Sequence, residues 1–342
     1  MQQKLRVGVI GLGFMGRTHV AGYQSAAQAG LPVSLVAVAD ARVHEILAGS
    51  SGGGNLSTAG TTGPLVADSV RRYAAAAELI ADADVDAISL CTPTDTHVEL
   101  SLAILRAGKH LLLEKPVAVA SADVERLRDA ARDNGRVCMP AMVMRFWPGW
   151  EWLADRIRDA NLGPLRSLEL ERRGSRPTWN AFYHDDARSG GALVDLHIHD
   201  SDFVFSCFGM PSAVTSVGSL NQVTTLYHYP TSQANPSLVV ASGGWGQSPG
   251  FGFRMRYLAN FERATADFDL SRGDRPVLLS DDRSSEPLEL PLLSGYDAEI
   301  RHFVEVVAGR ARPRATLDDA VAVARLLEAE RRSLESGGTV RL

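Results

Sequence analysis

Two short stretches of this chain contain side chains that can transfer protons. In both, the predicted backbone would restrict where those side chains lie. In "LLLEKPVAV", residues 111–119, three leucines lead into Glu114, Lys115 and Pro116. Proline restricts the residue before it to an extended backbone, so the Lys115 amine would be held at a strand end. There it could shuttle a proton or polarise a carbonyl. A surface Glu–Lys pair on a loop is the other interpretation.

The second stretch, "SGGALVDLHIHDSDFVFSCFG" at residues 189–209, combines acids with histidines. In a helix, Asp195 and His199 lie at i and i+4 on one face. The carboxylate would orient the imidazole, which could then take a hydroxyl proton while hydride leaves the same carbon. His197 falls on another face and is left out of this chemistry.

Two other interpretations of the second stretch stay open. One is a structural helix. The other is a metal site, because "DLHIH" resembles the His-x-His strand of metal hydrolases. Only His228 and His302 follow it, in unrelated contexts, so we expect no metal ligands in this chain.

A glycine loop near the N-terminus predicts a dinucleotide site. Gly11, Gly13 and Gly16 form G-x-G-x-x-G between an apolar run and a helical pattern. The first glycine permits a tight turn, the second lets a pyrophosphate approach, and the third allows close helix packing. The helix N-terminus then offers N–H groups to the phosphates.

An acid further along the chain extends this prediction. Asp40 ends the next apolar run and could accept the ribose hydroxyls of NAD. It could instead cap the following helix. Arg42 could hold the 2′-phosphate of NADP, so NAD is favoured and NADP stays open.

The loops after two further strands should also contact the cofactor, since ligands bind beyond the carboxyl ends of parallel strands. "CTPTDTH", residues 91–97, is one, and the Glu114–Pro116 turn is the other. His97 would face the nicotinamide or complete a helix cap. The predicted cofactor-binding residues are Gly11, Gly13, Phe14, Met15, Gly16, Asp40, Arg42, Thr92, Pro93, Thr94, His97, Glu114, Lys115 and Pro116.

The elements that would position these residues alternate along the first part of the chain. Apolar runs alternate with helical patterns, which indicates parallel βαβ units in a first domain of residues 1–140. Strands are predicted at 5–11, 33–40, 85–93 and 109–116, and helices at 17–30, 71–82 and 97–108. Residues 48–64, rich in Gly, Ser and Thr, are predicted to form a surface loop.

Residues 141–342 predict a second α/β domain. Residues 163–174 and 252–270 alternate apolar and polar side chains, as in antiparallel strands, and the phase change near Glu262 requires a bulge or turn. Helical patterns at 295–310 and 317–336 close the chain. The predicted fold is therefore an N-terminal Rossmann domain followed by an α/β domain with a large, mostly antiparallel open sheet.

The motifs "GLGFMG", "CTPTDTH", "AGKHLLLEKP" and "GGALVDLHIHDSD" resemble, in this order, those of the glucose–fructose oxidoreductase/inositol dehydrogenase (Gfo/Idh/MocA) family. The resemblance covers nearly the whole chain. It implies that Lys115 is the active-site lysine, beside Asp195 and His199, and that the Lys115–Pro116 bond is cis. It also implies association as a homodimer or homotetramer through the C-terminal sheet.

The activity implied is that of an NAD(P)-dependent dehydrogenase or reductase. Hydride would pass between nicotinamide C4 and a secondary alcohol or ketone of a sugar, cyclitol or related polyol. Two alternatives remain, namely a glycoside hydrolase or lyase that uses tightly bound NAD transiently, and a non-catalytic NAD(P) sensor. The residues leave the substrate, the direction and the proton carrier, His199 or Lys115, unassigned.

Substrate-binding candidates come from the start of the second domain and the segment before Asp195. For the arginine at the start of the second domain the alternative is an interdomain salt bridge, and for the others it is loop packing or a place on the rim. They are Arg145, Arg172, Trp179, Asn180, Tyr183 and His184.

Composition excludes several kinds of partner. The net charge of the 342 residues is −5 and no basic block occurs, which argues against nucleic acid and anionic membranes. No apolar stretch is long enough to span a bilayer. Three scattered cysteines, Cys91, Cys138 and Cys207, fit a reducing cytoplasm better than a disulfide framework.

Overall fold

The chain folds into two compact units. The computed structural model describes residues 4–48, 65–230, 235–273 and 275–342, so almost all of the predicted 48–64 loop lies outside the described residues. The first unit comprises residues 1–143 and 294–321, and the second comprises residues 144–293 and 322–342. The sequence predicts contiguous domains that meet at 140/141. In the structure, by contrast, the chain returns to the first unit at residue 294.

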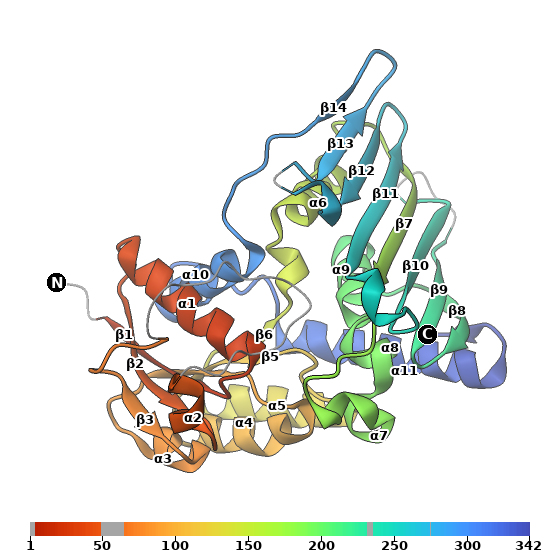
Figure 1. Cartoon of the computed structure of the whole chain (residues 1–342). Helices are drawn as coiled ribbons and strands as arrows, with labels where there is room; N and C mark the ends of the chain where they lie inside the picture. The colour runs from red at the N-terminus through yellow and green to blue at the C-terminus, as the bar shows by residue number, and fades with distance from the viewer. Residues whose placement is uncertain (1–3, 49–64, 231–234, 274) are drawn as a thin grey trace. The chain divides into compact units, whose positions relative to one another are not determined.

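The first unit is a parallel six-stranded sheet with helices on both faces, as the alternating pattern predicts (Figure 1). The strand order is β3-β2-β1-β4-β5-β6. Helices α1 and α10 lie on one face, and α3, α4 and α5 lie on the other. The strands are β1 (Leu5–Ile10), β2 (Val33–Ala39), β3 (Arg71–Tyr73), β4 (Ala87–Leu90), β5 (His110–Glu114) and β6 (Cys138–Ala141), and the helices are α1 (Phe14–Gln28), α2 (Val43–Leu47), α3 (Ala76–Ala81), α4 (His97–Arg106), α5 (Ser121–Asp133) and α10 (Gly295–Val307).

One predicted helix of this unit is partly wrong. Residues 71–82 begin as the edge strand β3, which pairs with β2, and only Ala76–Ala81 are helical. Edge strands this short carry polar side chains and give no apolar run. The Arg71 guanidinium instead pairs with the Asp82 carboxylate, at 2.8 Å.

Helix α10 packs against α1, although nearly 270 residues separate them in the sequence. A Cβ on Gly22 would overlap the Ile300 side chain, so a residue with no side chain is what lets the two helices approach. Both Ile300 and Phe303 on α10 are fully buried. The first unit therefore completes its core with residues from near the end of the chain.

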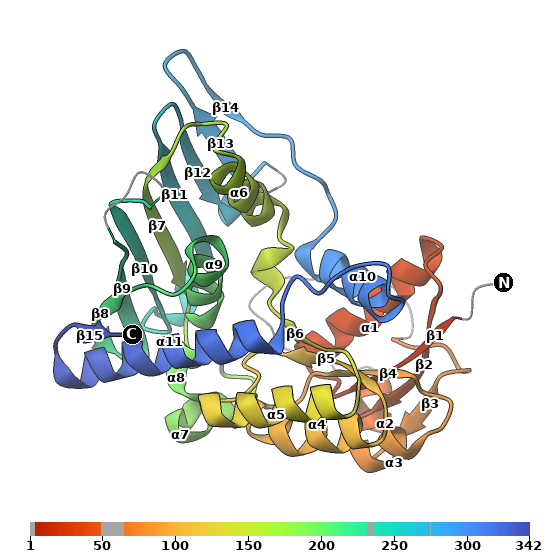
Figure 2. The ribbon, with the colours of Figure 1, turned by 180° about the vertical axis from the view of Figure 1, so that it is seen from behind.

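The second unit is a nine-stranded sheet in which β7 and β10 are parallel and the other neighbours are antiparallel. This confirms the mostly antiparallel sheet. Helices α6 and α9 and the later turns of α11 cover one face (Figure 2). The strands are β7 (Leu165–Arg173), β8 (Ala213–Ser219), β9 (Gln222–His228), β10 (Leu238–Gly244), β11 (Arg254–Phe261), β12 (Thr265–Asp269), β13 (Val277–Ser280), β14 (Ser285–Pro287) and β15 (Val340–Arg341), and the helices are α6 (Pro148–Asp159), α7 (Asp186–Ser189), α8 (Gly191–Asp195), α9 (Ile198–Phe208) and α11 (Leu317–Ser336).

An aromatic cluster fills the core between this sheet and its helices. Trp150 on α6 meets Phe203 on α9 and Tyr257 on β11 edge to face, at centroid distances of 4.8 and 5.4 Å. Such pairs contribute about 0.5–1.5 kcal/mol each beyond their buried area. The turn predicted near Glu262 is also present, because the Phe261 N–H donates to the Ala264 carbonyl between β11 and β12.

The stretch with Asp195 and His199 is not one continuous helix, as the i, i+4 argument assumes. Helix α8 ends at Asp195 and α9 begins at Ile198. The N–H groups of both Leu196 and His197 donate to the Ala192 carbonyl, which marks the break. No helix of the described residues is both long and apolar enough to cross a membrane.

Candidate dinucleotide and proton-transfer sites

The glycine loop joins β1 to the N-terminus of α1 and has the backbone that the motif predicts. Gly11 has φ +87°, and a Cβ on it would lie 2.7 Å from the Cys91 carbonyl oxygen. A Cβ on Gly16 would overlap the Gly11 carbonyl oxygen. Gly13, by contrast, is exposed and has no atom within 4 Å of its Cβ position. The loop is thus closed against the protein and open above Gly13, which fits a dinucleotide pyrophosphate.

Asp40 follows β2 and its carboxylate is fixed by backbone donors. Oδ2 accepts the Leu12 N–H at 2.8 Å, and Oδ1 accepts the Arg42 N–H at 2.9 Å. Asp40 thereby joins the end of β2 to the glycine loop, where a ribose would follow the pyrophosphate. The N-cap of α2 is Arg42, which has an exposed side chain.

The loop after β4 carries Thr92, Pro93 and Thr94. Thr92 and Thr96 share a hydroxyl hydrogen bond of 2.7 Å, and the Thr96 hydroxyl donates to the Pro93 carbonyl. Thr92 and Pro93 are half-buried, whereas the Thr94 side chain is buried. The first two therefore have surface available to a cofactor.

His97 lies elsewhere than the sequence predicts. Its side chain is fully buried, so it offers no surface to a nicotinamide. The ring nitrogens lie 2.8 Å from the carbonyl oxygens of Pro116 and Thr92. Burial lowers the pKa of His97, against the opposing effect of those carbonyls. His97 thus ties together the two loops predicted to hold the cofactor.

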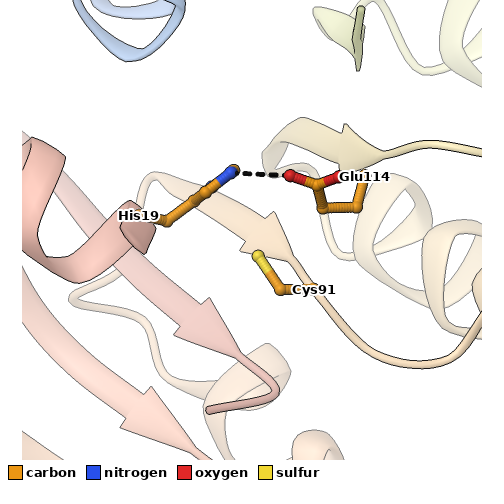
Figure 3. Close-up of side chains that lie close together, drawn as sticks. All are labelled: His19, Cys91 and Glu114. Carbon is orange, nitrogen blue, oxygen red and sulfur yellow. Dashed lines mark hydrogen bonds and ion pairs between the residues drawn. The ribbon is translucent and has the colours of Figure 1, made fainter. Parts of the chain in front are cut away.

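The Glu114 side chain also points into the protein rather than toward a ligand. Its Oε1 lies 2.9 Å from Nε2 of the buried His19 on α1, and its Oε2 accepts the Lys115 N–H at 3.2 Å (Figure 3). The pair therefore fixes the end of β5. Sequence analysis missed His19, although its place three residues after Gly16 puts it on the first turns of α1.

Cys91 joins His19 and Glu114 in a group whose ligand atoms all lie within 4.8 Å of one another, a spacing that could hold a metal ion. Desolvation and the charges of Glu114 and Glu299 raise the pKa of the Cys91 thiol well above its ordinary value. In the structure the group consists of the hydrogen-bonded His19–Glu114 pair beside the Cys91 thiol.

Lys115 occupies the carboxyl end of β5. It is half-buried, while the other residues from 111 to 118 are buried. The Lys115–Pro116 peptide bond is cis, as the family resemblance implies. Together with the glycine loop and the loop after β4, Lys115 lies on the edge of the sheet where parallel strands bind ligands.

Asp195 and His199 stand out in the same way within the second unit. Between residues 191 and 204 they are half-buried and every other residue is buried. Asp195 is the last residue of α8, and His199 is the second residue of α9. The helix break lies between them, so their exposure does not come from a shared face of a single helix.

Two predicted substrate residues, Arg145 and Arg172, form ion pairs; Arg172 is buried and Arg145 is half-buried. Arg145 contacts Asp202 through Nε and Nη2, at 3.0 and 2.6 Å. Arg172 is 2% exposed and binds Asp200, with Nη2 2.8 Å from Oδ1. Both guanidinium groups are thus paired with carboxylates on the first turns of α9.

The remaining substrate candidates lie on the segment between β7 and α8. The Asn180 side chain accepts the Phe182 N–H and so caps a short helical turn, and His184 is exposed. Trp179 is 42% exposed and meets Tyr183 edge to face, and Tyr183 meets the buried Trp245 in turn. Of these four, the two aromatic residues form part of a continuous row.

The fold and the loop define a two-unit protein whose first unit is a dinucleotide-binding Rossmann domain. The profile described as "Oxidoreductase family, NAD-binding Rossmann fold" matches residues 5–142, and that of the "GFO/IDH/MocA C-terminal domain" matches residues 150–237. The chain belongs to the GFO/IDH/MocA family of oxidoreductases.

Among curated relatives, the inositol 2-dehydrogenase of Rhizobium meliloti (strain 1021) is 30% identical over 220 residues, 63% of this chain and 59% of that protein. The trans-1,2-dihydrobenzene-1,2-diol dehydrogenase of Bos taurus is 33% identical over 171 residues, 48% of this chain and 51% of that protein. The chain thus spans little more than half the length of these relatives.

Among solved structures, levoglucosan dehydrogenase in complex with NADH and L-sorbose is similar to this chain with a TM-score of 0.81. The alignment covers 99% of each chain at 19% identity. At that identity the likeness establishes the fold alone.

Proposed function

We propose that this chain is an NAD(P)-dependent dehydrogenase or reductase that acts on a secondary alcohol or ketone of a sugar, cyclitol or related polyol. The first unit would bind the cofactor and the second unit the substrate. The observation that carries the proposal is the exposure of Lys115, Asp195 and His199 within stretches that are otherwise buried. The relatives named above act, by their names, on ring diols and an inositol.

A bound nicotinamide would supply the acceptor or donor of the hydride. In the direction of oxidation, His199 takes the proton of the substrate hydroxyl and Asp195 orients its ring. Lys115 stabilises the charge that develops on the substrate oxygen. Reduction uses the same residues in reverse, with the proton returned to the oxygen.

The test is a panel of sugars and cyclitols with NAD and NADP, followed by nicotinamide absorbance. On the substrate so found, His199→Asn is expected to lower kcat by about 10²–10⁴-fold, the usual contribution of a general acid or base, and to leave the Kd for NADH within about twofold. Unchanged turnover would remove His199 from the mechanism. Turnover of a glycoside with no net NADH would favour the hydrolase or lyase alternative.

We propose NAD rather than NADP as the preferred cofactor, supported by the Asp40 carboxylate at the end of β2. A fixed negative charge there accepts ribose hydroxyls and repels a 2′-phosphate. Asp40→Ala is expected to raise the NADP/NAD ratio of kcat/KM at least about tenfold, since like charges side by side cost several kcal/mol. The exposed Asp68, changed to Ala, provides the control and should leave the ratio unaltered.

The assembly proposed is a homodimer or homotetramer, formed through the face of the second sheet that α6, α9 and α11 do not cover. Apolar side chains on that face, such as Leu226, Val240 and Leu258, are half-buried in the single chain. A cytoplasmic location stays a prediction from the cysteines, which are free in the structure.

A further inference from the structure

The residues flanking His199 form a buried polar cluster that is held from three directions. His197, Asp200, Ser201 and Asp202 are each at most 1% exposed, whereas His199 among them is half-buried. Buried polar groups of this kind remain in place only when they are hydrogen-bonded or paired. Each of the four has such a partner on another element of the second unit.

Glu330 on α11 contacts residues on both sides of His199. Its Oε2 lies 3.1 Å from Nε2 of His197, two residues before His199. Its Oε1 accepts the hydroxyl of Ser201, two residues after His199, at 3.0 Å. Thr225 on β9 donates a third hydrogen bond to Oε2, at 3.1 Å. Glu330 is itself fully buried, so its geometry is set by these donors.

Two bidentate ion pairs hold the next residues of α9. Asp200 is bound by Arg172 from β7, and Asp202 by Arg145 from the turn before α6. Arginine–carboxylate pairs with two parallel hydrogen bonds restrict orientation as well as distance. The backbone on either side of His199 is therefore fixed by the sheet, by α11 and by the segment before α6.

A positive charge on His197 would complete the pairing of charges in the cluster. The buried carboxylates of Asp200, Asp202 and Glu330 face the guanidiniums of Arg145 and Arg172. Burial and the charge of Arg172 lower the pKa of His197. The negative charges of Glu330 and Asp200 raise it by more, so the pKa is raised overall. The other titratable group in contact is Tyr227 on β9, with its hydroxyl 3.3 Å from Nε2. Its pKa is raised by burial, so it remains neutral.

We propose that Glu330 is a positioning residue for His199, acting through His197 and Ser201 on either side of it. The proposal rests on the proposed function, in which His199 carries the substrate proton. Loss of the Glu330 charge leaves the segment packed but free to shift, and small displacements of a reacting group reduce turnover about 10²-fold. Cofactor binding, which depends on the first unit, is left intact.

The experiment compares Glu330→Gln with Tyr257→Phe in the full chain. Tyr257 donates a buried hydrogen bond to the Gly149 carbonyl in the same unit, so its loss destabilises without touching the cluster. Glu330→Gln is expected to lower kcat about 10–100-fold, with KM values within twofold. Tyr257→Phe should lower Tm while kcat stays within twofold. A kcat for Glu330→Gln equal to that of Tyr257→Phe overturns the proposal.

The pH profile supplies a readout that a merely structural role would not change. A raised pKa means that the pair with Glu330 is complete at low pH and is lost as pH rises through the folded pKa of His197. Turnover of the wild type is expected to fall over that range, and Glu330→Gln should lack this fall. An identical alkaline limb in both proteins overturns the proposal.

Two further measurements keep the outcome decisive. If Glu330→Gln does not fold, Ser201→Ala removes a single Glu330 contact and is expected to lower kcat with KM unchanged; an unchanged kcat is then the contrary result.

Without a substrate, amide hydrogen exchange of residues 197–202 should be faster in Glu330→Gln than in Tyr257→Phe, and equal exchange contradicts the proposal. Should His199→Asn retain turnover while Glu330→Gln loses it, the proposed function fails.

Discussion

At the scale of single residues, the sequence predicts best where residue type alone sets the backbone. Gly11 and Gly16 occupy places where a Cβ would meet backbone atoms, and the G-x-G-x-x-G spacing predicts that both positions require glycine. Arg145 and Arg172 show the opposite case. Their partners lie 57 and 28 residues away in the sequence, so no local pattern reveals that both guanidiniums are already bound.

The glycines provide a matched pair of variants. Gly13→Ala adds a methyl group where nothing lies within 4 Å, so Tm is expected to stay within about 2 °C while the Kd for NADH rises at least tenfold. Gly16→Ala forces the methyl into the Gly11 carbonyl and should cost about 1–3 kcal/mol of unfolding free energy. Thermal scans and fluorescence titration measure both. Undiminished NADH binding by Gly13→Ala would contradict the assigned pyrophosphate position.

At the scale of elements, the strands β1, β2, β4 and β5 and the helices α10 and α11 were predicted from their patterns, whereas the short strand β3 was not. The strand β3 has three residues and no apolar run, so its pattern reads as the start of α3. The break between α8 and α9 is invisible for another reason. It is marked by two N–H groups that share the Ala192 carbonyl, and the contact beside it joins His197 to Glu330, a residue far away in the sequence.

The start of β5 has a pH-dependent hydrogen bond. His110 Nδ1 accepts the Val137 N–H at 3.1 Å, which requires a neutral nitrogen. Burial, with the charge of Arg136, lowers the pKa of His110. A lowered folded pKa gives stability that is present above the unfolded value of about 6.5 and lost as pH falls. Unfolding free energy is therefore expected to decline between pH 7.5 and 5.

Urea titrations of His110→Asn test this origin. The Asn oxygen can accept the same N–H at any pH, so the decline should be shallower than in the wild type. His44→Asn changes an exposed histidine of the same unit and should follow the wild-type curve. If the unfolding free energy of His110→Asn declined with falling pH as steeply as that of the wild type, the acid sensitivity would come from other groups, such as His97.

At the scale of the whole molecule, the fold class was predictable from the order of motifs and periodic patterns. The division of the chain into two units was harder to predict. The helix at 295–307 follows the second sheet in sequence and gives no sign that it packs on α1 in the first unit. That contact depends on the shape of Ile300 over Gly22, which a periodic pattern does not encode.

The proposed assembly is tested by light scattering after size-exclusion chromatography. The wild type is expected at a multiple of 36.8 kDa. Val240→Glu places a charge on the uncovered face of the second sheet and should shift the mass toward that of one chain. Leu292→Glu alters an apolar side chain that is 89% exposed outside the sheet, and its mass should not change. A monomeric wild type would remove the assembly from the proposal.

The late arrival of α10 has a consequence for synthesis of the protein. The ribosome finishes the last strand of the dinucleotide-binding sheet about 150 residues before it makes the helix that covers α1. At about 5–20 residues per second, the side of α1 around Gly22 stays uncovered by α10 for roughly 8–30 s. Folding of the first unit is therefore completed only after α10 has been synthesised. A chaperone that shields α1 during translation would raise the yield of native protein.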